Sequence, residues 1–545
     1  MVWAGRSAIE IAAAVRQGEA SAIAVVEEHL RAIAERDVEV GAFRIVREQA
    51  VDEARAVQKR ADLDALPLAG VPVAVKDNLA VEGECSRNGS RATSAALAQG
   101  DHPAVARLRA AGAVVVGLTN VPELCLVGVG DSAFGTVRNP HDPARTAGGS
   151  SSGSAAAVAA GMVPVSLGND GLGSLRIPAA GCGVFTLKPG PGVVPPPTRD
   201  WRGMSENGPL ARSAADLALA LSVLAGEPGL ATAWREWPPA LPEDDDEDSE
   251  DDDWLLRPPR ALAPVRPGLR VAYAPQPLPP GFGMDAEFAQ ATVAAAERLR
   301  EAGHTVVEHP ERLPAELGPS AVATWLACAA DEAAHLDRGL MERRTRALAR
   351  AGRVLGRFGL DGRRVRERWR DYGADQWFGN ADVLLTPTLA TLPPPADRWG
   401  SRGLLRNVLV NVRSGPATAP WNLAGWPALS LPYGSHSSGL PIGLQLVAPP
   451  GGEPYLLLLA AHLTTHSVPS TPPAPTPPAP SAPSISATPN PSIPFNPSIP
   501  SSPSIPSSPS IPSSPSIPSS PSIPSSPSIP SSPYGKPGQA HRGHR

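Results

Sequence analysis

The feature that most limits what this chain can fold into is an abrupt change of composition near residue 466. Residues 467–545 hold 25 of the 66 prolines, and five perfect copies of Ser-Ser-Pro-Ser-Ile-Pro run from Ser501 to Pro530. This stretch contains no Asp or Glu. It cannot bury enough apolar surface to offset an ordering entropy of about 1–2 kcal/mol per residue. We therefore predict a disordered tail with polyproline II character after a folded domain spanning residues 1–466.

The charge of the body is dominated by one acidic segment. The whole chain has a net charge of −5, with 48 basic and 53 acidic residues, which excludes a basic protein that coats nucleic acid. Residues 243–253 carry ten carboxylates in eleven positions, and prolines lie on both sides of the segment. We expect a solvated, self-repelling surface loop, with an acidic interaction patch or a metal-binding loop as the less favoured interpretations.

Cysteine spacing and hydropathy restrict the redox state and the compartment. Cys85, Cys125, Cys182 and Cys328 have no CxxC or Cys-His spacing, so neither a disulfide framework nor a zinc site is indicated. Charged residues interrupt the N-terminal region before it could form a signal-peptide core, and no uncharged apolar run reaches the ~18 residues of a membrane span. We expect a cytoplasmic protein with reduced thiols and without nucleic-acid or membrane partners.

Apolar periodicity predicts an α/β layer fold. From Ser7 to about Lys59 apolar residues recur at helical spacing, with Ser21 as the expected N-cap of a helix. The β-branched runs 71–75 and 113–117 predict buried strands, with a helix at 103–111 directly before the second. Similar patterns predict helices at 154–161, 216–224 and 286–302 and strands at 163–167, 269–273 and 305–308. The alternation favours helices packed around a largely buried sheet.

Three short segments could carry chemistry. The first places Lys76 at the end of an apolar strand, the second is the Gly/Ser cluster 148–154, and the third is the glycine-rich segment 168–178. Each alone has an ordinary structural interpretation: a solvated lysine, a flexible turn and a backbone bend. Their significance depends on a reaction that needs all three.

Nucleotide binding and acyl transfer both use glycine-rich loops, but the residues fit only the second. The Gly/Ser cluster lacks the Gly-Lys-Ser/Thr ending of a phosphate loop, and the spacing of Gly168, Gly171 and Gly173 is not GxGxxG. In acyl transfer, a serine in a glycine-rich turn supplies a nucleophile and backbone amides for the developing oxyanion. A lysine can act as the base if burial lowers its pKa from ~10.4 towards ~7–8.

The segment from Gly148 to Ala179 resembles the signature of the amidase signature family, the serine amidases with a Ser, cis-Ser and Lys triad. The similarity extends over roughly residues 5–465. It includes further motifs at 134–140, 188–189, 384–388, 421–427 and 439–445. The resemblance implies a layered α/β fold with a mixed central sheet surrounded by helices.

The resemblance also implies roles for individual residues. Ser174 corresponds to the nucleophile, Ser150, after a cis peptide bond, to the proton relay, and Lys76 to the base. The oxyanion hole corresponds to the backbone N–H groups of Gly171, Leu172, Gly173 and Ser174. Asp170 and Arg176 correspond to residues that brace this turn. No organic cofactor or metal is implied.

Three positions depart from the family pattern. Leu172 stands where the family usually has glycine or alanine, and it would be strained if the position required a positive φ. Asn169 replaces the usual threonine, and Gly190-Pro-Gly replaces the familiar Thr-x-Gly. These departures indicate a divergent pocket. Segments around Trp201, Trp325 and Trp421 are expected to shape it, although each tryptophan could equally belong to the core.

The function implied is hydrolysis of a small-molecule carboxylic amide to an acid and ammonia or an amine, through an acyl-serine intermediate. One alternative is a component of a glutamine-dependent amidotransferase, which passes ammonia to a partner's active site. A second, from a different class, is a non-catalytic adaptor that presents the proline-rich tail. A homodimer is one open arrangement of the chain, and the substrate cannot be read from the sequence.

Overall fold

The computed structural model describes residues 2–231, 268–277, 283–309 and 313–464. Within these residues, eleven strands form one sheet in the order β1-β3-β2-β8-β10-β9-β14-β15-β13-β11-β12. Their bounds are β1 Phe43–Val46, β2 Pro72–Lys76, β3 Val114–Thr119, β8 Val165–Asp170, β9 Phe185–Lys188, β10 Glu206–Ala211, β11 Arg270–Tyr273, β12 Thr305–Glu308, β13 Val383–Pro387, β14 Ala428–Ser435 and β15 Pro441–Val447. The sheet is mixed, because β2 pairs in parallel with β3 and β8 whereas β8, β10, β9, β14, β15 and β13 pair antiparallel in succession.

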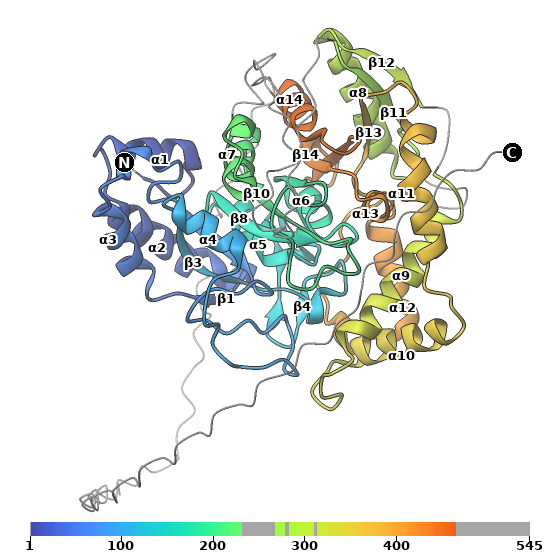
Figure 1. Cartoon of the computed structure of the whole chain (residues 1–545), viewed down its shortest axis with the longest axis horizontal. Helices are drawn as coiled ribbons and strands as arrows, with labels where there is room; N and C mark the ends of the chain where they lie inside the picture. Colours follow the sequence, from blue (N-terminus) through green and yellow to red (C-terminus); the bar gives the residue numbers. More distant parts are fainter. Residues whose placement is uncertain (1, 232–267, 278–282, 310–312, 465–545) are drawn as a thin grey trace, which may run out of the picture. The chain divides into compact units, whose positions relative to one another are not determined.

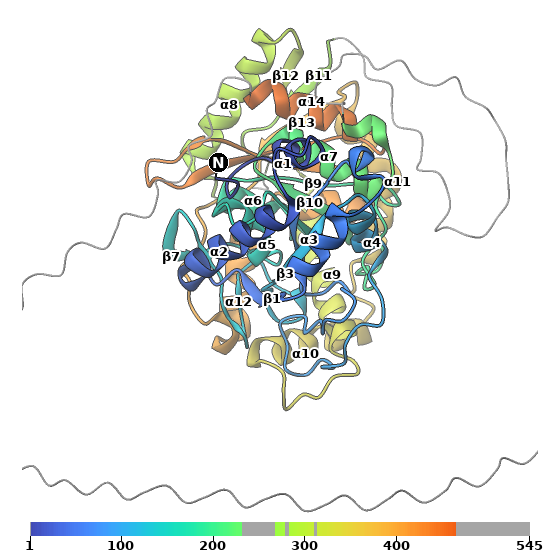
Figure 2. The same cartoon turned by 90° about the vertical axis from the view of Figure 1, so that its left-hand side faces the viewer.

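Helices surround this sheet (Figure 1). They are α1 Ala8–Arg16, α2 Ala22–Val40, α3 Ala50–Gln58, α4 Pro103–Ala110, α5 Ser152–Ala159, α6 Arg176–Cys182, α7 Ala214–Ala225, α8 Ala286–Glu301, α9 Leu317–Glu332, α10 Arg343–Arg357, α11 Arg363–Phe378, α12 Leu404–Ser414, α13 Ala419–Ala424 and α14 Glu453–Thr464. Helices α5 and α6 pack on each other and on central strands, and α7 and α14 form a second pair (Figures 1 and 2). The predicted α/β fold with a mixed sheet surrounded by helices is therefore confirmed.

Local sequence explains most of the element boundaries. Ser21 caps α2, because its side chain accepts a hydrogen bond from the N–H of Ala24, and Gly41 ends the helix in the left-handed conformation. One part of the N-terminal prediction is wrong. The region predicted to be helical to Lys59 contains the four-residue edge strand β1, which pairs antiparallel with β3 through Phe43, Ile45 and Val46. A strand this short shows almost no period-2 signal, so neighbouring helical spacing hid it.

The sheet topology brings two of the sequence segments to one edge. Strands β2 and β8 are parallel neighbours, with Val73 opposite Val165 and Val75 opposite Leu167. Their carboxyl ends therefore lie side by side, and the residues that end them, Lys76 and Asp170, meet there. The Gly/Ser segment enters the same region, since the N–H of Ser151 donates to the carbonyl of Ser174 over 3.0 Å.

Two sequence predictions fall on residues outside the described part of the chain. These are the acidic segment 243–253 and the proline-rich segment 467–545, so the division into a domain 1–466 and a tail stays a prediction. Among the described helices, none is both long enough and apolar enough to cross a membrane.

Candidate active site

Lys76 is completely buried, which is rare for a lysine. Its Nζ contacts three oxygens: Ser150 Oγ at 2.8 Å, Asn169 Oδ1 at 2.7 Å and the Asn169 carbonyl at 3.2 Å. Burial lowers the pKa of Lys76, although the carboxylate of Asp170 opposes the shift. A neutral amine has two N–H groups and one lone pair, which suits two acceptor oxygens and one hydroxyl.

Ser150 lies at the entrance to α5 and is 1% exposed. The peptide bond between Gly149 and Ser150 is cis, as the resemblance implies. Directly after it, α5 is built from small residues, and every one of its eight residues is buried. This close packing holds the Ser150 hydroxyl against the lysine amine.

Asn169 contacts Lys76, although the sequence reasoning did not assign it to the site. Its Oδ1 accepts from Lys76, while its Nδ2 donates to Asn78 Oδ1 over 2.9 Å. The Asn78 contact therefore orients the amide so that an acceptor faces the lysine. The sequence marked Asn169 only as a departure from the family pattern, and its neighbour across the sheet could not be seen from spacing.

The φ angles of the turn before Ser174 show whether Leu172 is strained. Leu172 has a negative φ, and the positive φ of +120° belongs to Gly173. Leucine at position 172 is therefore not strained by its φ angle. Of the four N–H groups predicted for the oxyanion hole, Gly173 donates to Asp170 Oδ1, whereas those of Gly171, Leu172 and Ser174 have no hydrogen-bond partner among the described residues.

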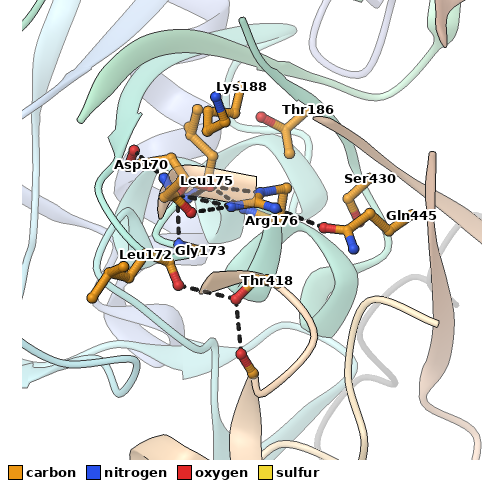
Figure 3. A network of polar contacts seen from close by, with 12 residues as sticks. Asp170, Leu172, Gly173, Leu175, Arg176, Thr186, Lys188, Thr418, Ser430 and Gln445 are labelled. Carbon is orange, nitrogen blue, oxygen red and sulfur yellow. Dashed lines mark hydrogen bonds and ion pairs between the residues drawn. The ribbon is translucent and has the colours of Figure 1, made fainter. Parts of the chain in front are cut away.

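Asp170 and Arg176 form a fully buried ion pair behind this turn (Figure 3). Arg176 Nε lies 2.9 Å from Asp170 Oδ2, and its other nitrogens donate to Gln445 Oε1 at 2.7 Å and Asn422 Oδ1 at 2.6 Å. Burial alone would raise the pKa of Asp170, but Arg176 and Asn422 hold it well below its usual range. The carboxylate also accepts from the N–H groups of Gly173 and Leu175.

Thr418 contacts the carbonyl of the Leu172–Gly173 peptide, whose N–H donates to Asp170 (Figure 3). Its Oγ1 lies 3.0 Å from the Leu172 carbonyl and 2.8 Å from the Gly415 carbonyl. The Leu172–Gly173 peptide is thus fixed at its carbonyl by a hydroxyl and at its N–H by a carboxylate. Sequence reasoning missed Thr418. It placed Asn422 and Gln445 in family motifs without assigning them to this turn, from which more than 200 residues separate all three.

Comparison with known proteins decides the family. A family model described as Amidase matches residues 24–457. The chain belongs to the amidase signature family. "Putative amidase AmiB2" of Mycobacterium tuberculosis is 39% identical over 82% of this chain and 93% of its own length. A glutamyl-tRNA(Gln) amidotransferase component of Thermus thermophilus is 35% identical over 83% of this chain and 95% of its own.

The fold of this amidase also matches solved structures. The structure of 6-aminohexanoate cyclic dimer hydrolase complexed with substrate superposes with a TM-score of 0.70 and 28% identity, covering 86% of this chain and 99% of that one. The family and its structural neighbours are amidohydrolases, so the chain is an enzyme that acts on carbon–nitrogen bonds.

Two pockets of the amidase meet at Ser174. The first, called the apolar pocket below, has no charged side chain among its described lining residues: Cys125, Leu126, Val127, Gly128, Gly149, Leu172, Ser174, Ile177, Trp201, Leu313, Pro314, Leu317, Gly318, Ala321, Val322, Trp325, Asn411, Val412, Gly415, Pro416, Ala419 and Pro420. The second, called the polar pocket, is lined by Asn78, Ala80, Ser86, Asn88, Thr93, Ser94, Ala96, Ala98, Leu124, Cys125, Ser150, Asn169, Gly171, Ser174, Pro197, Thr198, Arg199, Trp201, Ser205 and Glu332.

The three tryptophans expected near the pocket separate into two groups. Trp201 and Trp325 line the apolar pocket. Trp421 is fully buried and packs against Trp369, Trp377 and Trp426 in the core. Within the described residues, no group of three or more His, Cys, Asp or Glu side chains is placed to hold a metal ion.

Proposed function

We propose that this enzyme hydrolyses a carboxylic amide to an acid and ammonia or an amine through an acyl-Ser174 intermediate. The observation that carries the proposal is the buried Lys76 amine, 2.8 Å from the Ser150 hydroxyl, with its two remaining contacts on acceptor oxygens of Asn169. Burial lowers the pKa of Lys76 and so favours the neutral amine, which is the form that can take a proton. Ser174 is half-buried and lines the polar pocket together with Ser150, so a substrate can reach it.

The reaction begins when Ser174 Oγ attacks the amide carbonyl carbon. Its proton passes to Ser150 as the Ser150 proton moves to neutral Lys76. The N–H groups of Gly171, Leu172 and Ser174 stabilise the oxyanion, which is the largest single contribution in many acyl transfers. Collapse breaks the C–N bond, and Lys76 returns the proton through Ser150 to the leaving nitrogen. Water then attacks the Ser174 ester by the same relay, releasing the acid and regenerating the serine.

Three residues around the turn before Ser174 hold its peptide groups in place. Asp170 and Thr418 fix the Leu172–Gly173 peptide from its two ends, and Arg176 keeps Asp170 ionised. Because the oxyanion donors belong to the adjacent peptide groups, this support presets their direction before the substrate arrives.

A serine-directed phosphonate tests the nucleophile. The native enzyme should be labelled on one peptide, and Ser174→Ala should abolish both labelling and amide hydrolysis. Ser435→Ala is the matched control, since Ser435 is exposed on the far end of β14 and should behave like the native enzyme. Labelling that persists in Ser174→Ala would refute the assignment of the nucleophile.

A component of an amidotransferase is the second candidate, supported by the 35% identity to the Thermus thermophilus protein. Glutamine carries an ammonium and a carboxylate, and the described lining of the apolar pocket has no charge to pair with either. This observation favours the amidase. The amidotransferase predicts a stable complex with a second protein and weak hydrolysis of free amides, which size-exclusion chromatography of native lysate distinguishes.

The non-catalytic adaptor makes a separate prediction. If the proline-rich tail is the functional element, a chain ending at His466 should lose the function while hydrolysing nothing. An amidase predicts that the shortened chain keeps the full kcat/KM on amides.

A further inference from the structure

The apolar pocket is more hydrophobic than its residue types suggest, because the polar groups of Trp325 and Asn411 in its lining are already bonded to the protein. Trp325 Nε1 donates to the Leu126 carbonyl over 2.5 Å. Asn411 Oδ1 accepts from the N–H of Gly128, and its Nδ2 donates to the Asn407 carbonyl over 2.7 Å. A polar substituent entering this pocket would lose its water and find few partners.

The two pockets differ in their relation to the proton relay. Ser174 lines both pockets, so a substrate bound there extends into each. Ser150 belongs to the lining of the polar pocket, whereas the apolar pocket is bordered by the preceding Gly149. The leaving nitrogen must receive its proton from Ser150, and a proton donor has to lie within hydrogen-bond reach of its acceptor. The nitrogen therefore belongs on the polar side.

The polar pocket suits a departing amine and an entering water. Its lining includes hydroxyl and amide side chains, and Arg199 pairs with Glu332 at its wall. Glu332 is 7% exposed, and burial raises its pKa. Polar side chains in this wall offer hydrogen-bond partners to ammonia, a polar amine or the hydrolytic water.

We propose that the substrates are amides of uncharged, apolar carboxylic acids, with the alkyl or aryl acyl group in the apolar pocket and the amine leaving through the polar pocket. This inference rests on the proposed function and adds the substrate class and its orientation. The acyl group is recognised by burial of its hydrocarbon surface against Trp325, Ile177 and Leu317.

The first test uses the native enzyme and a pair of isosteric amides. Octanamide is compared with its ω-amino analogue, in which an ammonium replaces the terminal methyl group. We expect kcat/KM to be at least about 100-fold higher for octanamide, because the ammonium would be desolvated without a counter-charge. Equal kcat/KM values, or a preference for the charged amide, would overturn the proposed substrate class.

The second test determines the orientation with two matched alanine-to-phenylalanine variants. Ala321 of α9 lines the apolar pocket, and Ala98 lines the polar pocket; both are partly exposed. Ala321→Phe should lower kcat/KM at least about tenfold for octanamide, which has a large acyl group, and leave acetanilide, which has a large amine, within about twofold. Ala98→Phe should show the opposite pattern. A reversed result for both variants refutes the orientation.

Controls separate this inference from the proposed function. Melting temperatures confirm that each variant is folded, and Val322→Phe replaces Ala321→Phe if the latter does not fold, since Val322 lines the same pocket. If Ser174 reacts with the phosphonate but octanamide is no better than its charged analogue, only the inference fails. If Ser174 is not labelled and no amide is hydrolysed, the proposed function itself fails.

Discussion

Gly173→Ala is the sharpest test of the turn that presents the nucleophile. Gly173 has a φ of +120°, a conformation that L side chains rarely adopt. A Cβ atom at this position would lie 2.2 Å from Thr418 Oγ1 and 2.9 Å from Ile177 Cδ1. The substitution therefore combines a backbone cost with a steric cost, and both act on the peptide that precedes Ser174.

The two costs can be added. Holding a non-glycine residue in a sparsely populated region costs about 1–3 kcal/mol. Overpacking a buried site costs about 1–3 kcal/mol. The variant should therefore lose about 2–6 kcal/mol of unfolding free energy, a large part of the roughly 5–15 kcal/mol of an ordinary domain. If the chain relaxes by moving the turn instead, a displacement near 1 Å should reduce kcat by about 100-fold.

Urea denaturation and steady-state kinetics measure these effects, with Leu172→Ala as the matched control. Leu172 has a negative φ and is only half-buried, so its truncation should cost less than about 2 kcal/mol. A double-mutant cycle with Thr418→Ala, which removes the 2.2 Å contact, should recover about 1–2 kcal/mol of the Gly173→Ala cost. The reasoning is refuted if Gly173→Ala changes stability by less than about 0.5 kcal/mol and keeps native kcat.

Three further perturbations address buried titratable groups. Lys76→Met should reduce kcat/KM by about 10²–10⁴-fold. Lys76→Arg should be equally impaired, because a guanidinium does not release its proton and so cannot act as the base. If a kcat/KM–pH profile shows that arginine restores activity, Lys76 is a merely structural cation. Asp170→Asn should destabilise the fold by about 3–5 kcal/mol in urea, because it leaves Arg176 buried without its counter-charge, and a loss below about 1 kcal/mol would contradict the role given to this ion pair. His304 Nε2 lies 2.9 Å from His462 Nδ1, and burial together with His462 lowers the pKa of His304 to about 4. The unfolded chain thus binds a proton between about pH 6.5 and 4 that the folded chain does not, so native stability falls as the pH falls through this window. His304→Asn should make that fall shallower in melting temperatures measured across the range, and an unchanged slope would count against the assignment.

The sequence predicted the elements that depend on local patterns. The run 71–75 is a buried strand whose two faces are both covered, with valines on one face and Pro72 and Ala74 on the other, and it ends in Lys76 as expected. Ser21 caps its helix for the same local reason. The triad segments could be found because each is short and chemically distinctive. Their proximity depends on the parallel pairing of β2 with β8, which the alternation of strands and helices favours.

Contacts between distant segments could not be predicted in the same way. Thr418 and Asn422 lie 246 and 252 residues from their partners Leu172 and Asp170, and no periodicity links positions so far apart. The core position of Trp421 was equally open, since a tryptophan lines pockets and packs cores with the same surface. The short strand β1 was lost because four residues carry too little alternation to compete with flanking helices.

Leu172 illustrates what a family pattern can and cannot say about a site. A small residue at one position of a turn indicates either that the backbone needs a positive φ or that a neighbour lies close, and these causes have different consequences for leucine. The dihedral angles place the requirement for glycine one residue later, at Gly173, where both causes apply. Leu172 is then free to point its side chain into the apolar pocket, beside Trp201 and Ile177. The departure from the pattern therefore enlarges the hydrophobic lining next to Ser174, in agreement with an uncharged acyl group bound there.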